Sequence, residues 1–372
     1  MKTLKNIGKI ALLSLALCGG TTSCNYLDVV PPEQASLPDA TKDPESTLGF
    51  LFSCYGGIRN PFDYQTVEAG ADEYVLPPLW NTGSQKITWD LNLPTNIADG
   101  WSWGSNYRFI GQCLLFLQQL PHARGVTDEQ KRAWAAEANF LLAYYHMVTL
   151  VAYGPCPITD TYIDQATPES EYNGRMHFDY VKDWICQKFD EVCEDGQLPA
   201  TRTGDEWGRA TSVMAKALKA RLLVYAASPL FNGSFPYKDW ENTNFETPGY
   251  GKELISLKYD RKKWEVAKAA CQEAITAAEA AGHKLFSLED AQSLYQQAGL
   301  PLPFVPFKSA EGGTADKDKE FMERVQLMRY VVTTRYKEGN RETIWGLANQ
   351  GTMIIGSFPH RVIKNNQGTW KA

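Results

Sequence analysis

Cys24 is the residue whose chemistry the sequence indicates most directly, because an export segment leads up to it. Three lysines among the first nine residues precede an apolar stretch at 10–17 that is too short to span a bilayer, and small residues fill 19–23. This pattern is typical of a lipoprotein signal peptide, which is cleaved before a cysteine that then carries acyl chains such as palmitate. We expect residues 1–23 to be removed and Cys24 to hold the chain on a membrane. The alternative is a plain secretory signal that is cleaved elsewhere.

Two groups of aromatic residues outside the predicted helices offer surfaces for stacking. A sugar ring presents C–H groups on its faces and hydroxyls on its rim, so it suits a site of exposed aromatic planes and short polar groups. The candidate ligand-binding residues are Asp72, Tyr74, Trp80, Trp89 and Trp101 in the first group, and Tyr237 and Trp240 in the second, which spans 235–250. Trp80 and Trp89 flank a Thr-Gly-Ser turn and are the first choices as stacking platforms, with Asp72 as a hydroxyl acceptor. For any single ring, Trp101 above all, packing inside the protein is the more common role.

Residues with catalytic potential do not form a recognisable pattern. The carboxylates Glu137, Asp190 and Glu194 lie on predicted amphipathic helices, where ion pairing or solvation is the ordinary role. The histidines fall in no H-E-x-x-H or triad-like context, and no G-x-S-x-G motif is present; these histidines are His122, His146, His177, His283 and His360. The sequence therefore predicts no catalysis, with a glycoside hydrolase as the weaker alternative.

Metal and cofactor sites are not predicted either. Six cysteines remain once Cys18 leaves with the signal and Cys24 is acylated; they allow fifteen disulfide pairings, but none has C-x-x-C spacing and most lie in apolar helical patterns. Asp316, Asp318 and Glu320 alternate as calcium ligands do, yet the glycine and the closing glutamate of a calcium loop are missing. A solvated acidic loop is the preferred interpretation there.

The composition describes a folded, acidic chain. Its 372 residues are 44% hydrophobic and 12% aromatic, enough for a large core. The formal net charge is −6, and the signal lysines make the processed chain more acidic still, which excludes nucleic acid as a partner. After the export segment no stretch approaches 18 continuous apolar residues.

Helical periodicity dominates from residue 44 onward. Residues 25–43, with three prolines, are predicted to be a tether, and 44–372 a single helical domain. Thr127 and Gln130 form a capping-box pattern that opens one of the helices. The predicted helices span 44–58, 101–120, 128–153, 178–192, 214–225 and 264–278, the long loops 156–176 and 228–259, and the short strands 331–336 and 343–345. The fold class is therefore mostly α, with helix pairs similar to tetratricopeptide repeats but without their 34-residue period.

Four segments, in order along the chain, resemble the SusD/RagB family of outer-membrane lipoproteins. They are 24–32 (CNYLDVVPP), 136–145 with 153–158 (AEANFLLAYY and YGPCPI), 208–211 with 217–227 (GRAT and ALKARLLVYAA), and 340–345 (NRETIW). Two features depart from the family pattern. Leu142 occupies a position where the helix motif usually has arginine, and the chain stops before the Pro-Thr-Gln segment of longer members, so we expect it to be incomplete at its C-terminus.

The resemblance implies a helical binding platform at the cell surface. Such proteins are lipid-anchored in the outer membrane, bind oligosaccharide without catalysis, and deliver it to a SusC-like TonB-dependent transporter. Peptide capture is known within the family and remains an alternative. A scaffold that binds the transporter but no glycan is a third possibility.

Overall fold

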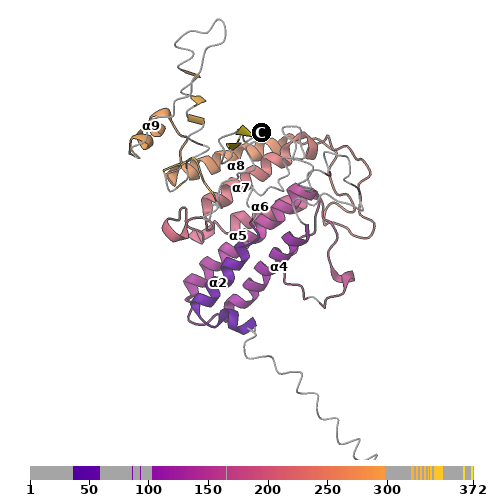
Figure 1. The fold of residues 1–372 in the computed structure, drawn as a ribbon. Coiled ribbons are helices and arrows are strands. Elements are labelled where there is room, and N and C mark those ends of the chain that lie inside the picture. The colour runs from indigo at the N-terminus through magenta and orange to yellow at the C-terminus, as the bar shows by residue number, and fades with distance from the viewer. Residues whose placement is uncertain are drawn as a thin grey trace, which may run out of the picture.

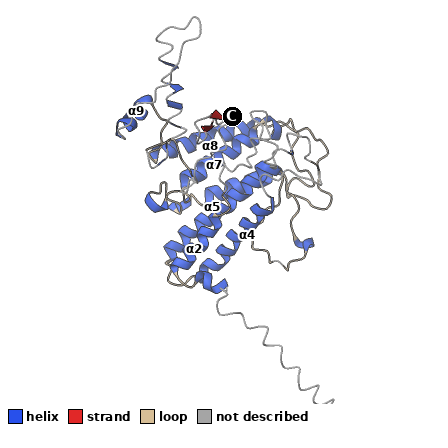
Figure 2. Ribbon diagram, viewed as in Figure 1, coloured by secondary structure: helices blue, strands red, loops and turns tan. Residues whose placement is uncertain are grey.

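The structure, a computed structural model, is a stack of helices (Figure 1, Figure 2). It describes residues 37–58, 103–164, 166–297 and 339–346, together with isolated positions at 86, 93, between 320 and 336, and between 363 and 371. Within this part of the chain the α-helices are α2 (Pro44–Tyr55), α4 (Trp103–Gln119), α5 (Asp128–Tyr153), α6 (Phe178–Glu191), α7 (Ser212–Ala227), α8 (Arg261–Ala280) and α9 (Leu288–Gln297). The mostly α fold predicted from periodicity is confirmed.

Helices that follow one another in the chain also pack against one another. α4 packs on α5, α5 on α6, α6 on α7, and α7 on α8, while α2 lies against both α4 and α5. This serial packing is the arrangement expected of repeated helix pairs. Short 3-10 turns join or flank the helices: η2 (Leu37–Thr41), η5 (Leu120–His122), η6 (Glu169–Glu171), η7 (Glu194–Gly196), η8 (Gly204–Glu206) and η9 (Pro229–Phe231). Thus residues 37–41, within the expected tether, form η2 and pack on α2.

The ends of the helices follow local sequence signals. The capping box of α5 is present: Gln130 N–H donates to Thr127 Oγ1 at 3.2 Å, and Thr127 N–H donates to Gln130 Oε1 at 3.0 Å. Gly154 ends α5 with φ of +70°, a backbone conformation that favours glycine. Asp43 caps α2 by accepting from Ser46 N–H at 2.7 Å.

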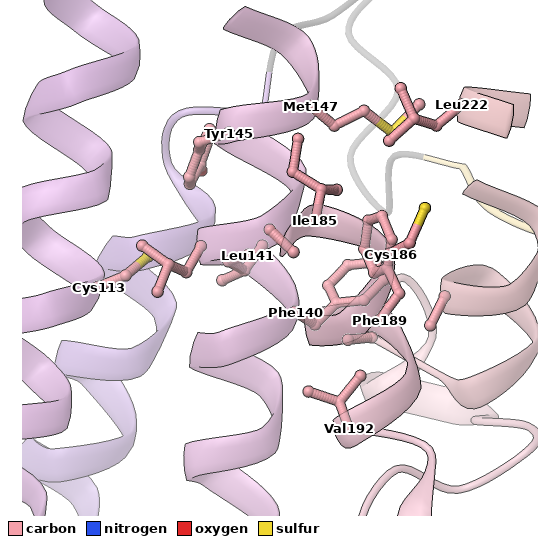
Figure 3. Close-up of a cluster of buried hydrophobic side chains, with 14 of the residues drawn as sticks. Cys113, Phe140, Leu141, Tyr145, Met147, Ile185, Cys186, Phe189, Val192 and Leu222 are labelled. Carbon is pink, nitrogen blue, oxygen red and sulfur yellow. The ribbon is translucent and has the colours of Figure 1, made fainter. Parts of the chain in front are cut away.

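The core is centred on α5, whose side chains reach both neighbouring helices (Figure 3). Leu141 and Tyr145 are buried on the α4 side near Cys113, and Phe140 packs against Phe189 of α6 with ring centroids 5.7 Å apart. On α8 the buried face consists of alanines, which allow close packing on α7. Trp264, predicted to share that face, is 42% exposed, because it lies at the edge of the alanine stripe.

The strand predictions were wrong at the positions described. Val331 is helical and Tyr336 lies in a 3-10 turn, whereas residue 343 is irregular and residues 344 and 345 form bends. Val331 and Leu327, four residues apart, pack on Phe286 and Ala291 in a small second core, so tertiary packing outweighs the β preference of this segment. The described strands are β1 (Ile363–Lys364) and β2 (Trp370–Lys371), an antiparallel pair.

Irregular chain gathers at one end of the stack, to the right of α6 and α7 in Figure 1. It includes the two long loops, 156–176 and 228–259, that the sequence predicted between helices. Among the described helices, none has the length and apolar character needed to cross a bilayer.

Candidate functional site

Only part of the predicted site falls within the described residues. Tyr237 and Trp240 are described, and both lie in the second long loop. The remaining candidates, Cys24, Asp72, Tyr74, Trp80, Trp89 and Trp101, lie outside the described residues and stay predictions, as does the pair Asp316 and Asp318 of the acidic stretch.

The aromatic loop, residues 232–259, carries a stacked pair of rings at its surface. Phe235 and Trp240 are nearly parallel, with centroids 5.4 Å apart and an interplanar angle of 10°. Tyr237 meets Phe235 edge-on at 5.8 Å and is 70% exposed. Trp240 is half-buried, and its ring lies over Gly154 at the end of α5, where an added Cβ would be 3.4 Å from the indole. Phe235 therefore supports two rings that reach solvent.

The chain at residues 173–178, which runs into the first residue of α6, holds the aromatic loop in place. The contacts that join the two segments include these: Phe245 packs directly on Gly174, Asn242 Nδ2 donates to the Arg175 carbonyl at 2.6 Å, His177 N–H donates to Thr247 Oγ1 at 2.9 Å, and Phe178 N–H donates to the Leu254 carbonyl at 2.9 Å. The two long loops predicted separately from the sequence are therefore one unit. Because buried backbone N–H groups need acceptors, the bonds made by His177 and Phe178 help to hold the loop in place.

His177 is the buried centre of that joint. Its ring stacks on Tyr250 with centroids 3.8 Å apart, and Nδ1 accepts from Asp179 N–H at 3.1 Å, which caps α6. With Nδ1 an acceptor, the proton is on Nε2, 3.1 Å from Ser256 Oγ. Burial lowers the pKa of His177 to about 4, although the Asp179 carboxylate nearby opposes that shift. The imidazole is thus neutral at pH 7, and its role is to pack on Tyr250 and cap α6.

Trp103, at the start of α4, is a further aromatic residue that the sequence reasoning missed. Its ring is covered by the Arg175 guanidinium 4.7 Å from the centroid, meets Tyr153 edge-on at 5.3 Å, and lies 5.1 Å from Tyr107. Its backbone N–H donates to Tyr153 Oη at 3.0 Å. The W-x-W pair of Trp101 and Trp103 was the available signal in the sequence, but that pattern does not identify the partners of Trp103.

A second polar site lies deep between α2 and α5 and is built around Glu137, which is completely buried. Its carboxylate accepts four hydrogen bonds: from Tyr55 Oη at 2.6 Å, Arg202 Nη2 at 2.9 Å, Arg209 Nη2 at 2.6 Å and Arg209 Nε at 3.0 Å. Burial, and next the Glu137 charge, raise the pKa of Tyr55 well above its usual value, so its hydroxyl stays protonated and donates. We call these four side chains the Glu137 network.

The Glu137 network is where three of the four resemblance segments meet. Glu137 belongs to the first helix motif, Arg209 to GRAT, and Trp345 of NRETIW donates from Nε1 to the Gly208 carbonyl at 3.0 Å. The Trp345 ring also packs on Phe140 and Tyr144, with centroids 5.5 Å and 5.2 Å away. Leu142 is buried in the apolar core, so this network uses Arg202 and Arg209 and needs no arginine at 142. These motifs therefore build the framework.

A shallow cleft lies beside the Glu137 network. Its empty volume, which includes the space at its open mouth, is about 280 Å³. Trp207 and Tyr336 line it and stack on each other at 5.3 Å, while Arg341 covers Tyr336 from 4.6 Å. Since Tyr336 already has two partners, the cleft provides little free ring surface for a ligand.

Two other groups considered for chemistry, Asp190 and His146, have structural partners. Asp190 pairs with Lys219 at 2.6 Å, and buried His146 places Nδ1 2.8 Å from the Leu142 carbonyl while Nε2 accepts from Thr159 N–H at 3.1 Å. The described cysteines are free thiols: Cys54, Cys113, Cys156, Cys186, Cys193 and Cys271. No group of three or more metal-ligating side chains occurs among the described residues.

Taken together, serial helix pairs and surface loops rich in aromatic rings define a helical-repeat fold with a candidate binding surface. Among solved structures, BT4246 is similar to the chain with a TM-score of 0.78 and 50% identity, covering 89% of this chain and 54% of that one. Its selenomethionine form gives 0.74 and 49%, over 88% and 53%. A SusD-like protein (BF3747) from Bacteroides fragilis NCTC 9343 gives 0.52 and 19%, over 70% and 44%, which shows the fold alone.

No family model matches the chain, and the search of curated proteins gave no significant match. The chain spans about half the length of BT4246. Its fold is SusD-like, in agreement with the SusD/RagB resemblance of the four sequence segments.

Proposed function

We propose that this chain is a surface glycan-binding protein that captures oligosaccharide at the aromatic loop. The observation that carries the proposal is the pair of surface rings, Tyr237 and Trp240, supported by Phe235 in a loop fixed to residues 173–178. A sugar face can pack on such rings while nearby polar groups bond its hydroxyls. A loop fixed before binding loses little conformational entropy when the ligand arrives.

The same proposal includes no catalysis and delivery to a partner. Glu137 and Asp190 are engaged in ion pairs, which favours binding over hydrolysis. By family resemblance the partner is a SusC-like TonB-dependent transporter in the outer membrane, and Cys24 carries the lipid that holds the chain at the cell surface. Replacing Cys24 by alanine should move the protein from the membrane fraction to the soluble one, whereas a membrane-bound variant would contradict the anchor.

Charge favours cationic peptides as the second candidate ligand. The two long loops, 156–176 and 228–259, together contain eight carboxylates and four cationic side chains. The excess of negative charge would attract a basic peptide more than a neutral sugar.

The deciding experiment titrates residues 25–372 against neutral oligosaccharides and basic peptides, with the ligands examined by mass spectrometry afterwards. Saturable binding of an unchanged oligosaccharide supports the proposal. Binding of peptides alone would replace it by peptide capture, cleavage would show an enzyme, and a folded chain that binds neither would favour the scaffold.

A further inference from the structure

Arg175 contacts both parts of the candidate site, the aromatic loop and the cluster of rings around Trp103. Its guanidinium lies over the Trp103 ring, and Nη1 donates to the Pro155 carbonyl at 2.6 Å, with the Tyr153 carbonyl 3.5 Å away. These two carbonyls flank Gly154, the residue on which the Trp240 ring rests. The side chain therefore fixes the end of α5 that supports Trp240.

The backbone of Arg175 reaches the aromatic loop by a second route. Its carbonyl accepts from Asn242 Nδ2 at 2.6 Å, two residues beyond Trp240. Asn242 N–H in turn donates to the Lys252 carbonyl at 2.9 Å, next to an antiparallel bridge between Glu241 and Glu253. If Arg175 moves, two supports of Trp240 move with it: the end of α5 at Gly154 and the loop backbone at Asn242.

We propose that Arg175 is the positioning residue of the binding site, which sets the aromatic loop against the end of α5 and the Trp103 cluster before ligand arrives. The inference rests on the proposed function for the identity of the ligand. The contacts by which Arg175 positions the aromatic loop are present without a ligand. A planar guanidinium suits the role because it stacks on an indole and donates in its own plane at the same time.

The first test needs no ligand. In Arg175→Ala, amide hydrogen exchange at Asn242 and Thr247, both bonded within the loop, should become several-fold faster. Arg108→Ala is the matched control, because Arg108 also lies over an aromatic ring, 4.9 Å from Phe109 on α4, but has no contact with the loop. Equal exchange in the two variants would overturn the proposal.

The second test uses the oligosaccharide that binds best in the titration. Arg175→Ala should weaken binding about tenfold, with an altered near-ultraviolet circular dichroism signal from Trp103, while Arg175→Lys recovers part of both. In a Trp240→Ala background the same change should matter less than twofold, because the ring it positions is gone. A tenfold loss in both backgrounds would overturn positioning, whereas a parent chain that binds no oligosaccharide would defeat the proposed function and leave the exchange test to decide this one.

Discussion

The Glu137 network and the aromatic loop use the same helix in opposite ways. Glu137 lies in the first half of α5, and Gly154, beneath Trp240, lies 17 residues later, about 25 Å along a helix. The Glu137 carboxylate is completely buried and accepts hydrogen bonds from four donor groups. Near Gly154, by contrast, aromatic rings reach the surface, and Tyr237 is 70% exposed. One region is closed to ligand and the other is open.

The difference teaches where a family resemblance is informative. Three of the four segments that resemble the SusD/RagB family come together around Glu137 and Trp345, where they join α2, α5 and the chain before α7. The open region contains YGPCPI at its edge, but its rings belong to a loop with no motif. Sequence motifs therefore report the framework here, whereas the aromatic loop, which carries the proposed binding surface, contains none of them, and loops generally vary more than the elements they connect.

The largest loss of stability is expected when the Glu137 network is disrupted. Glu137→Ala would leave Arg202 and Arg209 buried without their carboxylate, and the free energy of unfolding should fall by about 3–5 kcal/mol. Urea denaturation followed by circular dichroism measures it. Asp190→Ala is the matched control, since that ion pair is half exposed and should cost about 0–1 kcal/mol. Similar losses in the two variants would mean that the Glu137 network is no more important than a surface pair.

A second, smaller effect tests whether NRETIW belongs to the same framework. Trp345→Ala removes packing on Phe140 and Tyr144 together with the bond to Gly208, and should cost about 2–4 kcal/mol. Trp345→Phe keeps a ring but no N–H donor, and should cost about 1 kcal/mol. Denaturation midpoints distinguish them, and an alanine variant as stable as the parent would remove this segment from the framework.

The sequence predicted the closed region better than the open one for a physical reason. Helix boundaries at Thr127 and Gly154 depend on residues only a few positions apart, so they can be recognised locally. The sequence predicted that Glu137 would be solvated or ion-paired, but it did not predict that the ion pair would be buried. The contact of Arg175 with Trp103 joins an irregular segment to the start of α4 across 72 positions of the chain, and no periodicity in the sequence indicates it. The strand error at Val331 has the same origin, because packing with Leu327 on Phe286 decided its conformation.

The pH dependence of stability tests the boundary between the two regions, where His146 of α5 bonds to Thr159 of the first loop. Burial lowers the pKa of His146 from 6.5 to about 4. Between these values the unfolded chain binds a proton that the native one does not, so stability falls as pH falls from 6.5 towards 4 and this contribution is constant above 6.5. At pH 5 the loss should be about 2 kcal/mol. Denaturation at several pH values should give a smaller slope for His146→Phe than for His122→Gln, an exposed control; identical slopes would contradict it.

The smallest expected change in free energy, and the most informative one, is a change in binding at the aromatic loop. Replacing Tyr237 and Trp240 together by alanine should weaken oligosaccharide binding at least tenfold, about 1.4 kcal/mol, because the two solvent-facing rings are lost. The unfolding free energy should change far less than in Glu137→Ala. Tyr259 and Trp264, which are 60% and 42% exposed, provide a control pair of the same residue types outside the Phe235 stack. If the control pair weakens binding as much, or the Tyr237 and Trp240 variant binds normally, the ligand does not stack on Tyr237 and Trp240, and the comparison between closed framework and open site loses its second half.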